Sequence, residues 1–204
     1  MDFDLEYLKD LLQETVALRK QFPFSEPDED GCEITYLPTK LRIYWGGRID
    51  SLYFRHEKEK CGVAEKPMIR KNCKHYFRIV RKDGKLLRID TIINGRLDVI
   101  QLAHYEGDKR YCFPFSQTGG FYPTYVDVVR YEEGEIVEDY MVENVQILHR
   151  AYRKTDNNTI EFREINYVPS GIDPVRSKEI GYFTLNPNLT YTSTYNWTHW
   201  DDKK

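Results

Sequence analysis

The first apolar residues of the chain recur at helical spacing. One stripe consists of Leu5, Leu8, Leu12 and Val16. Such a stripe is typical of an amphipathic helix that packs one face against a core. Asp2 or Asp4 can cap the first turn, and Pro23 stops the pattern. The spacing therefore predicts a helix over about residues 4–21, packed on the protein's own sheet.

From about residue 32 the period changes to short alternating segments separated by glycine-containing turns. The clearest turns are Asp83-Gly84, Asn94-Gly95, Glu106-Gly107-Asp108 and Glu132-Glu133-Gly134. The first three of these glycines fall 11 and then 12 positions apart. This spacing is typical of an antiparallel meander, in which each strand pairs with the one before it. We expect a single domain over residues 1–204, with about ten strands between residues 32 and 198.

Three local predictions are less regular. Gly46-Gly47 suggests a hairpin between strands at residues 41–45 and 48–54. Residues 56–72 mix charges with Gly62 and Pro67, so we expect a long loop there. The tail over residues 179–200 has the pattern of one or two late strands.

Apolar residues lie on both faces of the predicted strands. Leu87 and Ile89 share one face, whereas Leu86 and Ile92 lie on the face that also carries Arg88. Covering on both sides predicts a mainly β fold, with the helix packed on a curved antiparallel meander sheet or barrel. The alternation does not separate a barrel from a two-sheet sandwich.

Composition limits the class of protein. The 204 residues are 40% hydrophobic and 31% charged, with 16 Tyr, 10 Phe and 3 Trp. No apolar run approaches the roughly 18 residues of a membrane span, and the acidic start lacks the layout of a signal peptide. We therefore expect a cytoplasmic protein with no membrane partner. The net charge of −3 argues against a protein that coats nucleic acid.

Local motifs of catalysis and metal binding are missing from the sequence. There is no phosphate-binding glycine loop, GxSxG elbow or HExxH helix. The four cysteines form no CxxC pair, so we expect no metal and no cofactor. The balance favours a non-enzymatic protein.

One histidine is a catalytic candidate. His149 falls in phase with Ile147 and Ala151 on an apolar face, and the next predicted strand carries Glu161 and Glu164. An inward histidine beside a carboxylate can act as a general base, or it can be a hydrogen-bonded core residue.

Charge patterning gives a candidate binding site. Acidic residues cluster around one predicted hairpin: Glu132, Glu133, Glu135, Glu138 and Asp139. Such a hairpin can attract a basic protein partner, or it can be a solvated turn that discourages edge-to-edge aggregation. A basic stretch runs from Lys66 to Arg88 and includes Tyr76 and Phe77, a mixture that single-stranded nucleic acid favours. Alternating strand positions divide this stretch between two faces, so we do not expect nucleic acid as the partner.

Three phrases of the meander share a motif. Residues 76–84, 85–95 and 96–107 meet at Gly-Lys-Leu or Gly-Arg-Leu, and a fainter copy spans residues 131–136. These phrases resemble the hairpin repeats of bacterial MORN-like and YD-type proteins, over less than a third of the chain. Several proteins with such repeats resemble antitoxin or immunity components, which implies that this chain neutralises a partner by binding it.

The sequence thus leads to a protein-binding module, plausible as a bacterial immunity or antitoxin-like protein. The alternative is a calycin-like β-barrel that holds a small apolar ligand or performs simple acid/base chemistry in its mouth, using His149. Self-association through sheet edges is a third hypothesis.

Overall fold

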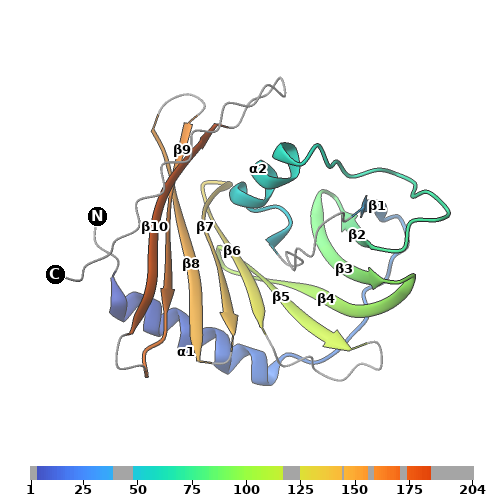
Figure 1. The fold of residues 1–204 in the computed structure, drawn as a ribbon. Helices are drawn as coiled ribbons and strands as arrows, with labels where there is room; N and C mark the ends of the chain where they lie inside the picture. The colour runs from blue at the N-terminus through green and yellow to red at the C-terminus, as the bar shows by residue number, and fades with distance from the viewer. Residues whose placement is uncertain are drawn as a thin grey trace.

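The computed structural model describes residues 4–38, 48–116, 125–143, 145–155, 159–170 and 174–184. Within them, ten antiparallel strands form one sheet, ordered β1 to β10 as in the sequence (Figure 1). The strands are β1 (Glu33–Pro38), β2 (Tyr76–Lys82), β3 (Lys85–Ile93), β4 (Arg96–Glu106), β5 (Lys109–Ser116), β6 (Val126–Glu132), β7 (Glu135–Glu143), β8 (Gln146–Lys154), β9 (Thr159–Tyr167) and β10 (Val175–Thr184). The predicted mainly β meander is therefore confirmed.

Tight turns join neighbouring strands where the sequence placed them. Both residues of the Asn94-Gly95 turn have positive φ, 53° and 74°, as do Glu133 and Gly134, at 52° and 85°. Two-residue turns of this kind match the right-handed twist of the flanking strands. Asparagine and glycine tolerate this backbone conformation better than other residues.

The N-terminal helix is also confirmed. It is α1 (Leu5–Gln21), and the Asp4 carboxylate caps it by accepting hydrogen bonds from the backbone N–H groups of Glu6 (3.0 Å) and Tyr7 (3.1 Å). The buried residues of the helix are Leu8, Leu11, Leu12 and Thr15. They lie on the predicted apolar side, which packs on the sheet.

A second helix corrects two predictions. Residues 48–54 do not form a strand, and residues 56–60 are not loop. Residues 48–51 form a turn, and α2 (Leu52–Lys60) follows it. The Ser51 hydroxyl accepts a hydrogen bond from the Phe54 N–H (3.3 Å), which makes Ser51 a helix N-cap. A serine between apolar residues resembles strand alternation, whereas the Glu57-to-Lys60 run favours helix. The other half of the predicted hairpin, residues 41–45, lies outside the described residues.

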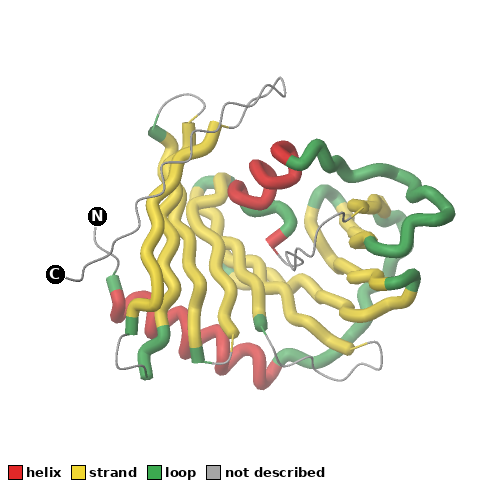
Figure 2. Tube along the Cα trace, in the orientation of Figure 1, coloured by secondary structure: helices red, strands yellow, loops and turns green. Residues whose placement is uncertain are grey.

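The two helices cover opposite faces of the sheet. α1 crosses what we call the outer face, and α2 lies inside the curve, on the inner face (Figures 1 and 2). The outer-face core joins α1 to Ile100, Leu102, Tyr111, Phe113, Val128, Tyr140, Val142, Ile147 and Ile165. The inner-face cores join α2 and its flanks to Phe77, Ile79, Ile89, Cys112, Val129, Phe162 and Phe183. This arrangement explains the apolar residues on both sides of the strands.

The sheet is not closed. β1 and β10 lie at its two ends, so the barrel alternative is wrong. Register shifts at Val80/Arg81, Thr91/Ile92 and Arg130/Tyr131 mark bulges, which bend strands and increase their twist. A bent open sheet with a helix on each face satisfies the same alternation as a barrel, which is why the sequence did not separate them.

The end of the chain is described only in part. β10 overlaps the start of the predicted late strands, whereas residues 185–204, with Tyr191, Ser193, Tyr195 and Trp197, lie outside the described residues. In the described part of the chain, neither helix combines the length and apolar character needed to cross a membrane.

Candidate functional site

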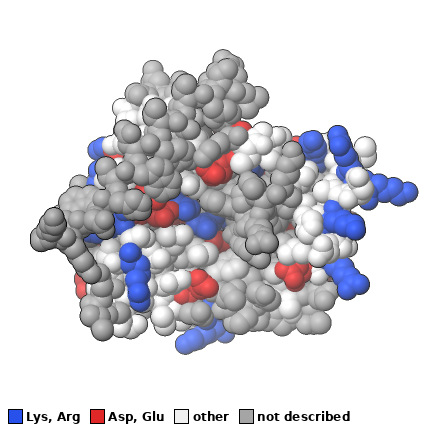
Figure 3. Space-filling view, viewed as in Figure 1, with Lys and Arg blue, Asp and Glu red and all other residues white. Residues whose placement is uncertain are grey.

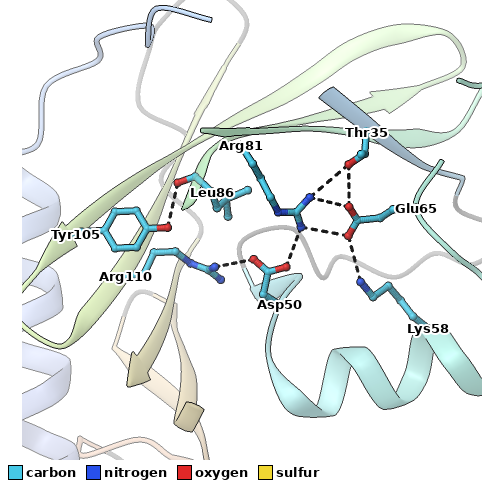
Figure 4. A network of polar contacts seen from close by, with 8 residues as sticks. All are labelled: Thr35, Asp50, Lys58, Glu65, Arg81, Leu86, Tyr105 and Arg110. Carbon is cyan, nitrogen blue, oxygen red and sulfur yellow. Dashed lines mark hydrogen bonds and ion pairs between the residues drawn. The ribbon is translucent and has the colours of Figure 1, made fainter. Parts of the chain in front are cut away.

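Ion pairs lie between the segment that contains α2 and the inner face, beside the apolar cores. The first group centres on Asp50, which precedes α2 (Figure 4). Its carboxylate contacts Nη1 of Arg110 on β5 (2.8 Å) and Nη2 of Arg81 on β2 (2.9 Å). Burial raises the pKa of Asp50, but the charges of Arg110 and Arg81 outweigh it and hold that pKa below its usual range.

Arg81 also binds a second carboxylate, Glu65, which follows α2 in the chain. Arg81 Nη1 donates to Glu65 (2.6 Å), which also accepts from Thr35 Oγ1 on β1 (2.8 Å) and pairs with Lys58 of α2 (3.3 Å). Burial raises the pKa of Glu65, but the hydrogen bond and charge of Arg81 bring it below its ordinary value. β1, β2 and α2 are thereby tied together at one end of the sheet.

A second group lies under the start of α2. Arg48 pairs with Asp127 on β6 (3.0 Å) and Asp139 on β7 (3.4 Å), and both carboxylates are fully buried. Asp139 also contacts Arg150 of β8 (3.6 Å) and accepts a hydrogen bond from the Tyr152 hydroxyl. Burial and then the Asp139 charge raise the pKa of Tyr152 well above its usual value, so this phenol stays protonated.

These two groups, with Glu164 of β9, which pairs with Arg150 (2.5 Å), form what we call the inner-face network. Its cations are Arg48, Lys58, Arg81, Arg110 and Arg150, and its anions are Asp50, Glu65, Asp127, Asp139 and Glu164. The two sets contain five charges each. Charges of the 48–65 segment are offset by opposite charges on the sheet. We interpret the network as a set of ion pairs that holds α2 against the inner face.

The side chains beneath α2 can be compared with those of an apolar-ligand site. A site for an apolar ligand is lined mainly by apolar and aromatic side chains. The inner face beneath α2 carries buried charges beside its apolar cores, including Arg110 at 1% exposure. The lining beneath α2 is therefore mixed, with apolar and charged side chains together.

The candidate His149 lies on the outer face, under α1. Its Nε2 is 2.6 Å from Glu138, and the Tyr7 hydroxyl of α1 donates to the same carboxylate (2.5 Å). Arg130 of β6 is the third partner of Glu138. The structure thus gives His149 an acidic neighbour, but it is Glu138 on β7 and neither Glu161 nor Glu164. His149 is only 3% exposed, so its geometry is that of a core residue that anchors α1.

The five acidic residues of the candidate binding site separate into two sets. Glu132, Glu133 and Glu135 are exposed at the tip of the β6–β7 hairpin, which we call the acidic tip. Glu138 and Asp139 are buried on opposite faces of β7, in the His149 cluster and the inner-face network respectively. Of the five, only the three residues of the acidic tip are exposed to solvent.

The cysteines offer no metal site. All four are free, and no group of three potential ligands occurs in the part of the chain that the structure describes. Cys112 is fully buried beside Arg110, and burial raises the pKa of its thiol to about 12. A thiol that remains protonated is a poor nucleophile.

Sequence reasoning missed the inner-face network. One local signal existed, because Asp127 stands between apolar residues in Val126–Val129, and Arg110 precedes the apolar run of β5. A lone charge in a buried strand needs a partner, since isolated buried charges are costly. The identity of that partner depends on Arg48 and Asp50, which the sequence placed in a strand.

Comparison with known proteins adds no relative: no family model, curated protein or solved structure matches this chain. The chemistry of the described residues is therefore the basis for a function.

Proposed function

We propose that the protein acts by binding a protein partner with a basic surface, and that the acidic tip makes the contact. The observation that carries this proposal is the state of Glu132, Glu133 and Glu135. All three are exposed, and none takes part in an ion pair or side-chain hydrogen bond with a described residue. Three free carboxylates within four positions form a preorganised anionic surface.

The acidic tip also carries a cost in stability. Glu132 and Glu135 are direct cross-strand partners at the end of the hairpin. Like charges in this arrangement are destabilising, by a few tenths of a kcal/mol up to about 1 kcal/mol. A repulsive pair that no described cation neutralises is consistent with a contact that is completed by another molecule.

At two other hairpins of the same sheet, the charged residues next to the turn have partners within the protein. Glu106 and Lys109 face each other as an opposite-charge pair at the β4–β5 turn. At the β2–β3 turn Lys82 and Lys85 are partners, but Lys82 donates to the Asp30 carbonyl (3.2 Å), and Lys85 lies over the Tyr105 ring at 5.8 Å. The acidic tip differs from both, because its charges have no such local partners.

The resemblance to hairpin-repeat proteins extends the proposal. If the partner is a toxin, the protein would act as an immunity or antitoxin component and block it by occupying its basic surface. Electrostatic complementarity of this kind accelerates association and selects the partner, so binding should weaken as salt increases.

The test compares three immobilised proteins in lysate of the source organism. The tip variant is Glu133→Lys plus Glu135→Lys, which avoids the buried Glu138. The control variant, Asp10→Lys plus Asp98→Lys, makes the same change in net charge at two exposed positions elsewhere. We expect the wild type and the control to retain one basic protein that the tip variant does not retain. The activity of that captured protein should fall when it is bound.

Two results would contradict the proposal. Equal retention of the captured protein by the tip variant would remove the acidic tip from the interface. Loss of binding in the control as well would show attraction by net charge alone. Denaturant unfolding of all three proteins confirms that they are folded.

A further inference from the structure

A second charged surface lies in the loop after α2. Residues 66–74 contain four exposed cations, Lys66, Arg70, Lys71 and Lys74, and no acidic residue. None of the four forms an ion pair with a described residue; the preceding carboxylate, Glu65, is bound by Arg81 and Lys58. Lys and Arg side chains gather at this end of the molecule (Figure 3). We call residues 66–74 the basic loop.

The structure separates this loop from the rest of the basic stretch. Arg78 is bound by Glu29 and by Asp90 (3.0 Å), and Arg88 also pairs with Asp90 (2.6 Å). Arg81 belongs to the inner-face network. Arg78, Arg81 and Arg88 are therefore paired with carboxylates within the protein, whereas the four cations of the basic loop are not paired with any described carboxylate.

Backbone hydrogen bonds hold the basic loop at both ends. Tyr36 and Lys66 exchange two of them, at 2.8 and 2.9 Å. The Cys73 N–H donates to the Arg70 carbonyl (2.9 Å) and closes a turn, and the Gly95 N–H donates to the Lys74 carbonyl (2.8 Å). The cations are thus presented by a defined piece of backbone, which lowers the entropy lost on binding.

An exposed apolar residue lies among these cations. Met68 is 79% exposed, the highest value among the large apolar side chains that the structure describes as exposed. Its neighbours along the chain include Lys66 and Arg70. An apolar side chain flanked by cations is the composition that the interface of an anionic bilayer accommodates, with the apolar group below the charged headgroups.

We propose that the basic loop docks the protein reversibly on the surface of an anionic lipid bilayer, with Met68 inserted among the headgroups. Single-stranded nucleic acid fits less well, because it needs exposed aromatic faces. Phe77 is buried, and Tyr76 packs edge-on against Tyr36 with ring centroids 6.0 Å apart. The proposal departs from the expectation of no membrane partner, which rested on the lack of a spanning segment.

The expected strength follows from the number of charges. Each Lys or Arg near an anionic surface raises membrane affinity about fivefold. Neutralising two of the four cations should therefore lower the affinity about 25-fold. Such binding is weak for a single loop, and it should disappear at high salt.

The experiment is co-sedimentation of the full chain with vesicles of phosphatidylcholine and phosphatidylserine in equal parts, and with vesicles of phosphatidylcholine alone. The loop variant is Arg70→Gln plus Lys71→Gln. Its matched control is Arg176→Gln plus Lys178→Gln, an exposed Arg and Lys on β10 that also form no ion pair with a described residue. Met68→Ser tests the apolar contact.

We expect the wild type and the control to bind the anionic vesicles only. The loop variant should bind about 25-fold more weakly, and Met68→Ser severalfold more weakly. Equal binding by the loop variant and the wild type would overturn the proposal. So would binding to a labelled single-stranded oligonucleotide without binding to vesicles, since the loop would then bind soluble polyanions. The acidic tip takes no part in these measurements, so this proposal can fail independently of the proposed function.

Discussion

Individual buried charged residues link several elements of this protein. Arg110 is fully buried on β5 and neutralises Asp50 at 2.8 Å, and Glu138 collects three partners on the opposite face. An intact buried ion pair adds little net stability to a fold. Removal of one partner is strongly destabilising, because the other charge is then buried without compensation. Replacing one partner of such a pair should therefore lower the free energy of unfolding more than replacing both.

Replacing Arg110 by methionine should destabilise the fold by about 3 kcal/mol, because Asp50 loses one of its two cations while remaining partly buried. Urea unfolding measures this loss. Asp50→Asn in the Arg110→Met background should recover part of the stability, since the uncompensated charge is then gone. Additive losses in the double variant would show that the two side chains are not coupled.

Acid should remove the contribution of Glu138. Burial raises its pKa, but His149, Tyr7 and Arg130 together lower it from its ordinary value of 4.5 to about 2. The unfolded chain then binds the proton more tightly than the folded one, so the contribution of about 3 kcal/mol is present above pH 4.5 and is lost as the pH falls toward 2.

Urea unfolding of the wild type and Glu138→Gln across this pH range provides the test. The stability difference should be largest near neutral pH and should shrink below pH 4.5. Glu133→Gln, at an exposed position, should follow the wild type. A Glu138→Gln difference that is constant with pH would contradict the assignment.

At the scale of elements, the turns and caps act locally and the acidic tip does not. Asp4 and Ser51 stabilise the two helices through their own backbone neighbours. The β6–β7 hairpin instead places Glu132 opposite Glu135. This element should be more stable when its charges are changed, even though its proposed binding function is lost.

The substitution Glu135→Lys should stabilise the fold by about 0.5 kcal/mol, because it converts a repulsive cross-strand pair into an attractive one. Glu133→Lys, in the turn and without a cross-strand partner, should have a smaller effect. Thermal or denaturant unfolding separates the two. A loss of stability in Glu135→Lys would mean that the tip carries no net repulsion.

The described part of the molecule is one open sheet with a helix on each face, and it exposes the acidic tip and the basic loop on separate segments. The inner-face network connects β2, β5, β6 and β7 to the segment before α2, and Arg150 of β8 extends it to Asp139 of β7 and Glu164 of β9. Strands in the middle of the sheet therefore have two paired neighbours and a helix against them. The end strands β1 and β10 pair with a named strand on one side only.

Hydrogen exchange should reflect this difference. Amides of β5 to β8 should exchange most slowly, because their opening requires loss of both helices and of the buried ion pairs. Amides of β1 and β10 should exchange faster, through local opening. Mass-spectrometric exchange of peptides from each strand measures this order, and protection of β1 equal to that of β6 would show that the sheet opens only as a unit.

Local regularities allowed much of the fold to be predicted from sequence. The stripe from Leu5 to Val16 specifies α1, and the positions of Gly84, Gly95 and Gly134 specify the hairpins, because each signal depends on residues within a few positions. α2 was missed for the same reason: Ser51 is compatible with both a strand and a helix cap. The acidic tip was predicted in part, since Glu132, Glu133 and Glu135 belong to the turn itself.

The sequence by itself therefore determined α1, the meander order of the strands and the covering of both faces. Only the tertiary structure decided that the sheet is open, that α2 lies inside its curve, and which charges meet. Arg48 and Asp139 are 91 positions apart, and His149 finds Glu138 across a strand pair rather than Glu161 or Glu164. Periodicity reports the face on which a side chain lies, but a buried charge is neutralised by whichever partner the folded chain brings within reach.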